Sequence, residues 1–151
     1  ETIPIQSEDL HYQVARIYGD LDEKNLMKEI IEDLVARKNG KPVNRVEYAN
    51  TLYQELGDPD KAIDILEEMR SEFLQIESIL SIKGFDKNFI SRRRWNQWQK
   101  AYPEVVNSLV YIYRKNDRNF DAEIVLSDWV LRNPKDTNAQ EILEQIRSGK
   151  K

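Results

Sequence analysis

The sequence predicts an all-α protein, and three observations support that fold class. Apolar side chains recur at steps of three and four residues along most of the chain, which is the period of an amphipathic helix. Only five glycines and five prolines are present, and they lie where helices would begin and end. No convincing run of alternating polar and apolar residues favours a β-strand. Because 151 residues suit one compact domain or a short stack of helices, we expect a single domain over 1–151.

Short polar breaks divide the chain into seven main helices and a short final one. Their expected ranges, in chain order, are 8–18, 22–37, 44–56, 59–82, 92–98, 103–115, 120–133 and 137 onwards. The fourth helix is expected to be unusually long, because its apolar stripe continues without interruption as far as Leu80.

The first two helices are expected to meet at Gly19. Glycine at this place would end the first helix, and Asp20 would cap the second. The side chains that the first helix should turn towards the core are Leu10, Val14, Ile17 and Tyr18. An Asn-Gly pair and a proline within 39–42 then form the turn that leads into the third helix.

The corner between the third and fourth helices has the clearest local pattern in the sequence. Gly57 can adopt the left-handed conformation that ends a helix, and Asp58 can cap the next one. Pro59 suits the first helical position, because no backbone N–H is needed there. We therefore expect two helices to meet in a tight turn here.

Three further breaks set the ends of the later helices. Gly84 is expected to end the fourth helix, and Pro103 is expected to open the sixth. Thr137 and Gln140 have the spacing of a capping box, so Thr137 should begin the final helix.

Two helix pairs repeat the same five-residue pattern. In the second pair, at steps of four, five, four and three, the residues are Tyr53, Gly57, Ala62, Leu66 and Met69. In the third pair, at the same steps, they are Tyr113, Asp117, Ala122, Leu126 and Trp129. The first pair fits less well, with Ala15, Gly19 and Asp20 in register but Lys24 at the alanine position. Small alanines at the shared position would let two helices approach closely.

This pattern resembles the tetratricopeptide repeat, whose terminal proline is matched by Pro134. The resemblance covers about two thirds of the chain. It implies a right-handed solenoid of helical hairpins, with about three irregular repeats and a C-terminal capping helix. Ala62 and Ala122 are 60 residues apart, against about 34 in that family. We therefore expect an insertion at about 84–100, packed on one side of the solenoid.

A second resemblance concerns the N-terminal part of the chain. Residues Glu1 to Ile5, followed by Tyr18 to Leu21, look like part of the soluble helical tail of certain bacterial multi-span membrane proteins related to glycosyltransferases. That resemblance implies an accessory tail in the periplasm, on a protein anchored in the membrane elsewhere. Without it, the default expectation is a cytoplasmic protein.

Composition argues against several classes of function. Cysteine is absent and His11 is the only histidine, so a disulfide framework or a zinc or non-haem iron site is not expected. No uncharged stretch approaches the roughly 18 apolar residues of a membrane-spanning helix. Neither a glycine-rich phosphate loop nor a nucleophile elbow is found. We therefore expect a protein that is not an enzyme and that uses no cofactor or metal.

The first helix of each repeat should line the concave face of a tetratricopeptide-like stack. The side chains expected there, outside the buried stripe, are Asp9, Gln13, Arg16, Glu47, Thr51, Gln54, Asn107, Tyr111 and Arg114. Their mixed polarity suits a protein or peptide partner, and simple solvation is the alternative at each position. The expected function is capture of that partner without a chemical step.

Residues 83–100 are basic within an acidic chain. Six basic residues and one acid give this segment +5, which leaves −9 for the rest of a chain with net charge −4. The candidate partner contacts in it are Arg92, Arg93, Arg94, Trp95 and Trp98. Such residues can bind nucleic acid or contact acidic lipid headgroups. We favour the alternative that the tryptophans pack the insertion against the other helices, since an acidic protein is a poor nucleic-acid binder.

Overall fold

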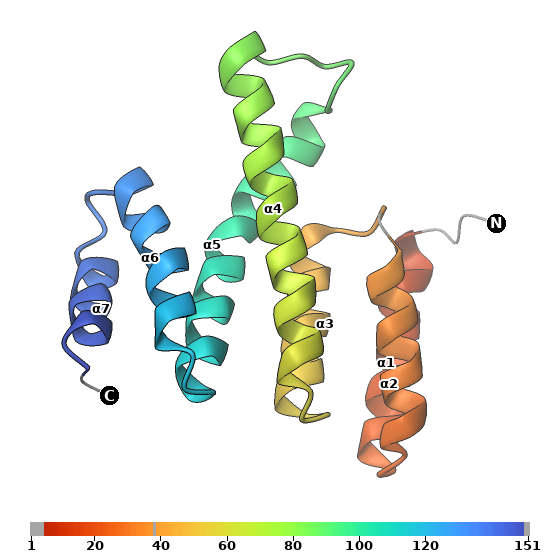
Figure 1. Ribbon diagram of the computed structural model, residues 1–151. Helices are drawn as coiled ribbons and strands as arrows, with labels where there is room; N and C mark the ends of the chain where they lie inside the picture. The colour runs from red at the N-terminus through yellow and green to blue at the C-terminus, as the bar shows by residue number, and fades with distance from the viewer. Residues whose placement is uncertain (1–4, 38, 150–151) are drawn as a thin grey trace.

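The computed structural model describes residues 5–37 and 39–149, and over these ranges the chain forms seven helices and no strand (Figure 1). The helices are α1 (Ile5–Asp20), α2 (Lys24–Ala36), α3 (Pro42–Gln54), α4 (Pro59–Lys83), α5 (Arg92–Lys115), α6 (Asn119–Arg132) and α7 (Thr137–Arg147). The predicted all-α fold class is confirmed. Residues 1–4, which carry part of the resemblance to a membrane-protein tail, lie outside the described ranges.

Neighbouring helices pack side by side from one end of the molecule to the other. α1 packs on α2, α3 on α4 and α5 on α6, while α7 packs on α6. Figure 1 shows α1 and α2 at one end and α7 at the other. Buried apolar side chains form one cluster that extends from Ala15 in α1 to Ile146 in α7. Hydrophobic burial along this cluster is the main force that holds the helices together.

Three helix pairs turn through the same kind of corner. Asp22, Gly57 and Asp117 each have a left-handed backbone, with φ of 60°, 63° and 57°. The backbone N–H of the next residue then donates back to a carbonyl near the end of the first helix, as from Glu23 to Tyr18 at 2.8 Å. The corresponding bonds are 2.9 Å and 2.8 Å long in the other two corners. Such bonds satisfy carbonyls that a helix end leaves unpaired.

The corner of the first pair lies three residues later than predicted. Gly19 is inside α1, and the left-handed residue that ends this helix is Asp22. Asp20 therefore does not cap α2, whose preceding residue is Glu23. Counted from Asp22, the first pair has the same steps of four, five, four and three, through Tyr18, Asp22, Met27, Ile31 and Leu34. The first pair thus has the same spacing as the other two, and this spacing was missed because the corner was predicted at Gly19.

Methionine replaces alanine at the close-packed position of the first pair. Ala62 and Ala122 are completely buried, and Met27 occupies the corresponding place, also buried. Space for its longer side chain comes from the facing helix, because a methyl group on Gly19 would lie 2.8 Å from the Met27 sulfur. Close packing is therefore kept by moving the small residue from the second helix of the pair to the first.

The predicted inward stripe of the first helix is wrong for two of its four residues. Leu10 and Ile17 are exposed, whereas Val14 is half-buried and Tyr18 packs against the core, where α1 also buries Ala15. Ile17 corresponds in the repeat pattern to Leu52 of α3 and Ile112 of α5, both of which are buried. α3 and α5 each pack against a preceding helix, whereas no helix precedes α1 in the described part of the chain. α1 thus has apolar residues at the positions that are buried in α3 and α5, but no described helix covers that face of α1.

The predicted insertion is built as an extension of two helices. α4 has 25 residues and α5 has 24, against 13 each for α2 and α3. About a dozen extra residues lengthen each helix by roughly 18 Å. Residues 84–91 join the far ends of α4 and α5 at the top of Figure 1. Gly84 ends α4 with φ of 74°, as predicted.

Pro103 lies inside α5 and does not open a helix. The expected helices over 92–98 and 103–115 are therefore one. Proline cannot donate to the carbonyl four residues earlier, which belongs to the exposed residue Gln99. Its neighbours Tyr102 and Val106 are buried, so burial outweighs the lost hydrogen bond.

Aspartates cap two of the helices, α4 and α7. Asp58 accepts the Lys61 backbone N–H at 3.0 Å, which confirms the predicted cap. The cap of α7 is Asp136, which accepts from the Ala139 N–H at 3.0 Å, so the predicted capping box at Thr137 is wrong. Thr137 is the first residue of α7, and the Gln140 amide instead donates to the Pro134 carbonyl.

These two caps predict how stability depends on acid. The Lys61 N–H and then Lys28 lower the pKa of Asp58, while the Trp129 indole N–H and then the Ala139 N–H lower that of Asp136. A carboxyl group whose pKa is lower in the folded than in the unfolded protein stabilises the fold at pH values above its unfolded pKa of about 3.9. This stabilisation is lost as the pH falls through the folded-state pKa.

We therefore expect Asp58→Asn with Asp136→Asn to flatten the fall in unfolding free energy between about pH 5 and pH 3, because asparagine caps without titrating there. Urea unfolding over a pH series measures the slope. Asp64→Asn, at an exposed position on α4, is the control and should leave the slope as in the wild type. Equal slopes for the double variant and the wild type would show that the two caps do not govern acid sensitivity.

Candidate binding surface

The first hollow of the surface lies between α1 and α3 and has a volume of about 750 Å³. Five predicted contact residues line it, namely Gln13, Arg16, Glu47, Thr51 and Gln54. Glu55 and Glu104 lie at its margin, so the hollow is more acidic than basic. Predicted contact residues from two separate helices, α1 and α3, thus line the same hollow.

Two of these five residues are already engaged within the protein. Arg16 forms an ion pair with Glu55. Thr51 is buried, its hydroxyl donates to the Glu47 carbonyl at 2.9 Å, and it lies 3.1 Å from the Tyr12 hydroxyl. Gln13, Glu47 and Gln54 are exposed, so they are the side chains of this hollow that a partner can reach.

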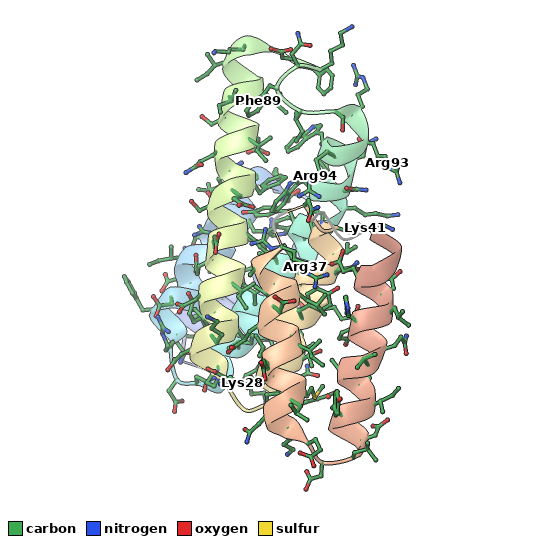
Figure 2. The ribbon with its side chains drawn as sticks, turned by 90° about the vertical axis from the view of Figure 1, so that its right-hand side faces the viewer. Lys28, Arg37, Lys41, Phe89, Arg93 and Arg94 are labelled. Carbon is green, nitrogen blue, oxygen red and sulfur yellow. The ribbon has the colours of Figure 1, made fainter. Side chains whose placement is uncertain are left out.

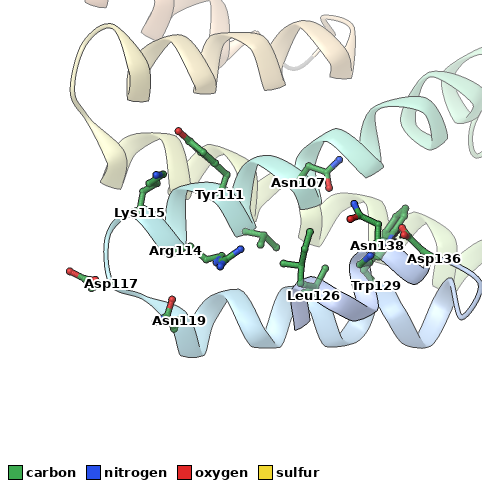
Figure 3. A pocket seen from close by; sticks show the side chains of 13 residues that line it. Asn107, Tyr111, Arg114, Lys115, Asp117, Asn119, Leu126, Trp129, Asp136 and Asn138 are labelled. Atoms are coloured by element: carbon green, nitrogen blue, oxygen red, sulfur yellow. Dashed lines mark hydrogen bonds between the residues drawn. The ribbon is translucent and has the colours of Figure 1, made fainter. Parts of the chain in front are cut away.

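The second hollow lies between α5, α6 and α7 and has a volume of about 720 Å³ (Figure 3). It contains the predicted residues Asn107, Tyr111 and Arg114. Its apolar lining comes from Val110, Leu126, Trp129, Ala139 and Ile142. Lys115, Asn119 and Asn138 line it as well, and none of the three was predicted from the sequence. Asn138 belongs to α7, which was predicted only as a capping helix.

The polar side chains of the second hollow are largely uncommitted. Asn107, Arg114, Asn119 and Asn138 form no hydrogen bond or ion pair to other described residues. Lys115 places its ammonium group 5.7 Å from the centre of the Tyr111 ring. These groups are free to bind a ligand that offers carbonyl, amide or carboxylate groups.

One wall of the second hollow is held rigidly. The Trp129 indole N–H donates to Asp136 at 3.0 Å, and the other oxygen of the same carboxylate caps α7. α6 and α7 are thereby tied together beside the apolar lining. A preorganised wall lowers the entropy that binding costs.

The two hollows are separated by one helix. Glu104 of α5 lines the first hollow, and Asn107, one turn later, lines the second. Tyr111 of α5 also contacts Tyr53 of α3 edge to face, with ring centres 6.3 Å apart. The two hollows therefore share α5 as a common wall.

A buried polar cluster that was not predicted from the sequence lies near the start of α1. Glu8 is buried and accepts from the Tyr48 hydroxyl at 2.8 Å, while burial raises the pKa of Tyr48. Buried Arg45 donates to Glu72 at 3.1 Å. Arg94 donates to the Gly40 carbonyl at 2.6 Å. The cluster fixes α1, α3, α4 and α5 to the loop before α3.

The predicted aromatic contacts of the basic segment are part of the core. Trp98 is only 2% exposed. Trp95 is half-buried and stacks on Phe73, with ring centres 5.3 Å apart and planes 15° apart. Trp98 therefore has no exposed ring face for a base and is removed from the candidate contacts, while Trp95 has one face covered by Phe73. Arg92 and Arg93 remain exposed.

The described residues include no group of three or more His, Asp or Glu side chains arranged to hold a metal ion. Within the same ranges, no helix is both long enough and apolar enough to span a bilayer. No protein-family description, no curated protein and no solved structure matches this chain.

Proposed function

We propose that this protein is a non-catalytic interaction module that holds an extended peptide segment of another protein across its two hollows. In this proposal the helix pairs form a right-handed, tetratricopeptide-like solenoid that α7 caps. The observation that carries the proposal is the second hollow, where four partnerless polar side chains surround an apolar floor. Specific binding sites commonly combine an apolar lining with a few converging polar groups.

The side chains of the second hollow suit a peptide. Each asparagine amide can donate to a backbone carbonyl and accept from a backbone N–H, which is what an extended chain presents. Arg114 and Lys115, with Asp117 beside them, supply charged groups of both signs at one end, and the floor around Leu126 can take an apolar side chain of the ligand.

The positions of the strongly shifted titratable groups support binding rather than catalysis. The largest pKa increases fall on Tyr48 and Tyr113, whose hydroxyls donate to Glu8 and Glu67. Neither tyrosine lines a hollow, whereas the most strongly shifted groups of an active site face the cavity. Tyr12 and Asp136 do line the hollows and have smaller pKa shifts, and both are held in hydrogen bonds within the protein.

Selection of a displayed random peptide library on the wild-type protein tests the proposal. We expect selected peptides whose binding weakens about tenfold or more in Arg114→Ala and in Asn138→Ala, because each variant removes direct contacts. Gln54→Ala should weaken the longer peptides that reach the first hollow. Fluorescence anisotropy with labelled peptides measures these affinities.

Two exposed positions outside the hollows supply matched controls. Asn25→Ala on α2 and Arg93→Ala on α5 remove the same side-chain types and should leave peptide affinity unchanged. The proposal fails if the library yields no binder, or if selected peptides bind the Arg114 and Asn138 variants as well as they bind the controls.

A further inference from the structure

The protruding end of the long helices exposes four large apolar side chains close together. We call residues 79–93 the tip; it comprises the last turn of α4, the connecting loop and the first residues of α5. Ile79, Ile82, Phe85 and Phe89 each expose between 37% and 81% of their surface. Single exposed apolar residues are ordinary, but four within eleven residues at the end of a protrusion indicate a contact surface.

The tip is also basic, although the protein is acidic. It contains Lys83, Lys87, Arg92 and Arg93 and a single acid, Asp86, for a net charge of +3. Since the whole chain carries −4, the remainder carries −7. None of the four basic residues forms an ion pair with another described residue. Asp86 accepts the Asn88 backbone N–H at 2.8 Å, which orders the loop.

Basic and apolar groups lie beside one another in the tip. The Arg92 guanidinium lies over the Phe85 ring, 4.2 Å from its centre. Figure 2 shows Phe89 on the protruding part and Arg93 pointing outward from α5. A ligand that complements this surface must therefore combine negatively charged groups with an apolar region.

The length of the protrusion separates this charge from the acidic body. The extra length of α4 and α5 is roughly 18 Å, whereas charges in physiological salt are screened over about 8 Å. The positive potential of Lys83 and Lys87, at the outer end of the tip, is therefore little weakened by the acidic groups elsewhere on the molecule. Arg93 lies nearer the body, since the next residue, Arg94, donates to the Gly40 carbonyl.

We infer that the tip docks on the surface of a lipid bilayer that contains anionic lipids. Isoleucine and phenylalanine side chains enter the boundary between headgroups and acyl chains, and the basic side chains bind the headgroups. The acidic body is repelled by the same surface, so the protein stands on its tip with both hollows away from the bilayer. Nucleic acid fits less well, because Trp98 is buried and Trp95 already stacks on Phe73, so neither is placed to stack on bases as an exposed ring would. Exposed isoleucine side chains also have no stacking interaction to offer a base.

Sedimentation with lipid vesicles tests the inference. We expect binding to vesicles of phosphatidylcholine and phosphatidylserine at a roughly 7:3 ratio in about 0.1 M salt, and little binding to pure phosphatidylcholine. Lys87→Gln with Arg93→Gln should lower the partition coefficient roughly 25-fold, at about fivefold for each charge removed. Ile82→Ser with Phe89→Ser should lower it about tenfold or more, with the charge unchanged.

Matched controls change the same side-chain types elsewhere. Phe120→Ser with Leu131→Ser alters two α6 residues that are 74% and 82% exposed, and Lys24→Gln with Lys61→Gln removes two exposed charges. Both control variants should bind vesicles as the wild type does. All of these positions are on the surface, and circular dichroism verifies that each variant is folded.

Three results would overturn the inference. The first is equal binding to neutral and anionic vesicles, or no binding to either. The second is equal loss of binding in the tip variants and their controls. The third is a single-stranded oligonucleotide that binds more tightly than the vesicles and loses affinity with Lys87→Gln and Arg93→Gln, which would make the tip a nucleic-acid surface. None of these results bears on peptide capture by the hollows.

Discussion

Replacing Trp98 with alanine is expected to lower the free energy of unfolding by about 3–5 kcal/mol. Its side chain is 2% exposed and belongs to the apolar core. Alanine would leave a cavity in this core, because helices that are fixed elsewhere cannot close over it.

Urea unfolding followed by circular dichroism measures this loss. Tyr111→Ala, which truncates a half-exposed aromatic residue of the same helix, is the control and should cost less than about 1.5 kcal/mol. If Trp98→Ala were as stable as the wild type, the indole would not be a core residue, and a contact role for it would have to be reconsidered.

Met27→Ala is expected to destabilise the protein by about 2–5 kcal/mol. Alanine is the residue that the second and third helix pairs have at this place, so the repeat pattern alone would favour the change. The first pair differs because Gly19 faces Met27, and two small residues opposite one another would leave a void.

The same geometry predicts that the effect of Gly19→Ala reverses sign with its neighbour. In the wild type the new methyl group would lie 2.8 Å from the Met27 sulfur, and this clash should outweigh the roughly 1 kcal/mol gained in helix propensity. In Met27→Ala the clash is absent, so Gly19→Ala should recover about 1 kcal/mol.

A double-mutant cycle measures this coupling. Met69→Ala supplies the matched background, since Met69 is buried in another helix pair and Gly19→Ala should still destabilise it. Additive effects at positions 19 and 27 would mean that the two residues do not share space.

The helix ends that the sequence predicted correctly depend on local chemistry. Asp58 and Pro59 begin α4 and Gly84 ends it, as the backbone preferences of these residues require. The corner at Asp22 was missed because glycine is the usual left-handed residue, and a glycine lies three positions earlier. Pro103 was misplaced because the burial around it comes from contacts that a local pattern does not contain.

The residues of the candidate site likewise include some that the sequence pattern predicts and others that depend on contacts between helices. Helical spacing indicated which residues point to one side, so Gln54, Asn107 and Arg114 line the hollows as expected. Spacing could not show that Arg16 is paired with Glu55, 39 residues away, nor that α7 would complete the second hollow. Contacts of that range depend on how the helices pack.

The packing of each helix against its near neighbours along the chain also bears on how the protein folds. The substantial contacts within the described ranges join helices that are one or two places apart in chain order. Few long loops must close before native contacts form, and such a topology favours rapid folding. The first hairpin can therefore form during translation, before the ribosome has synthesised the last helix.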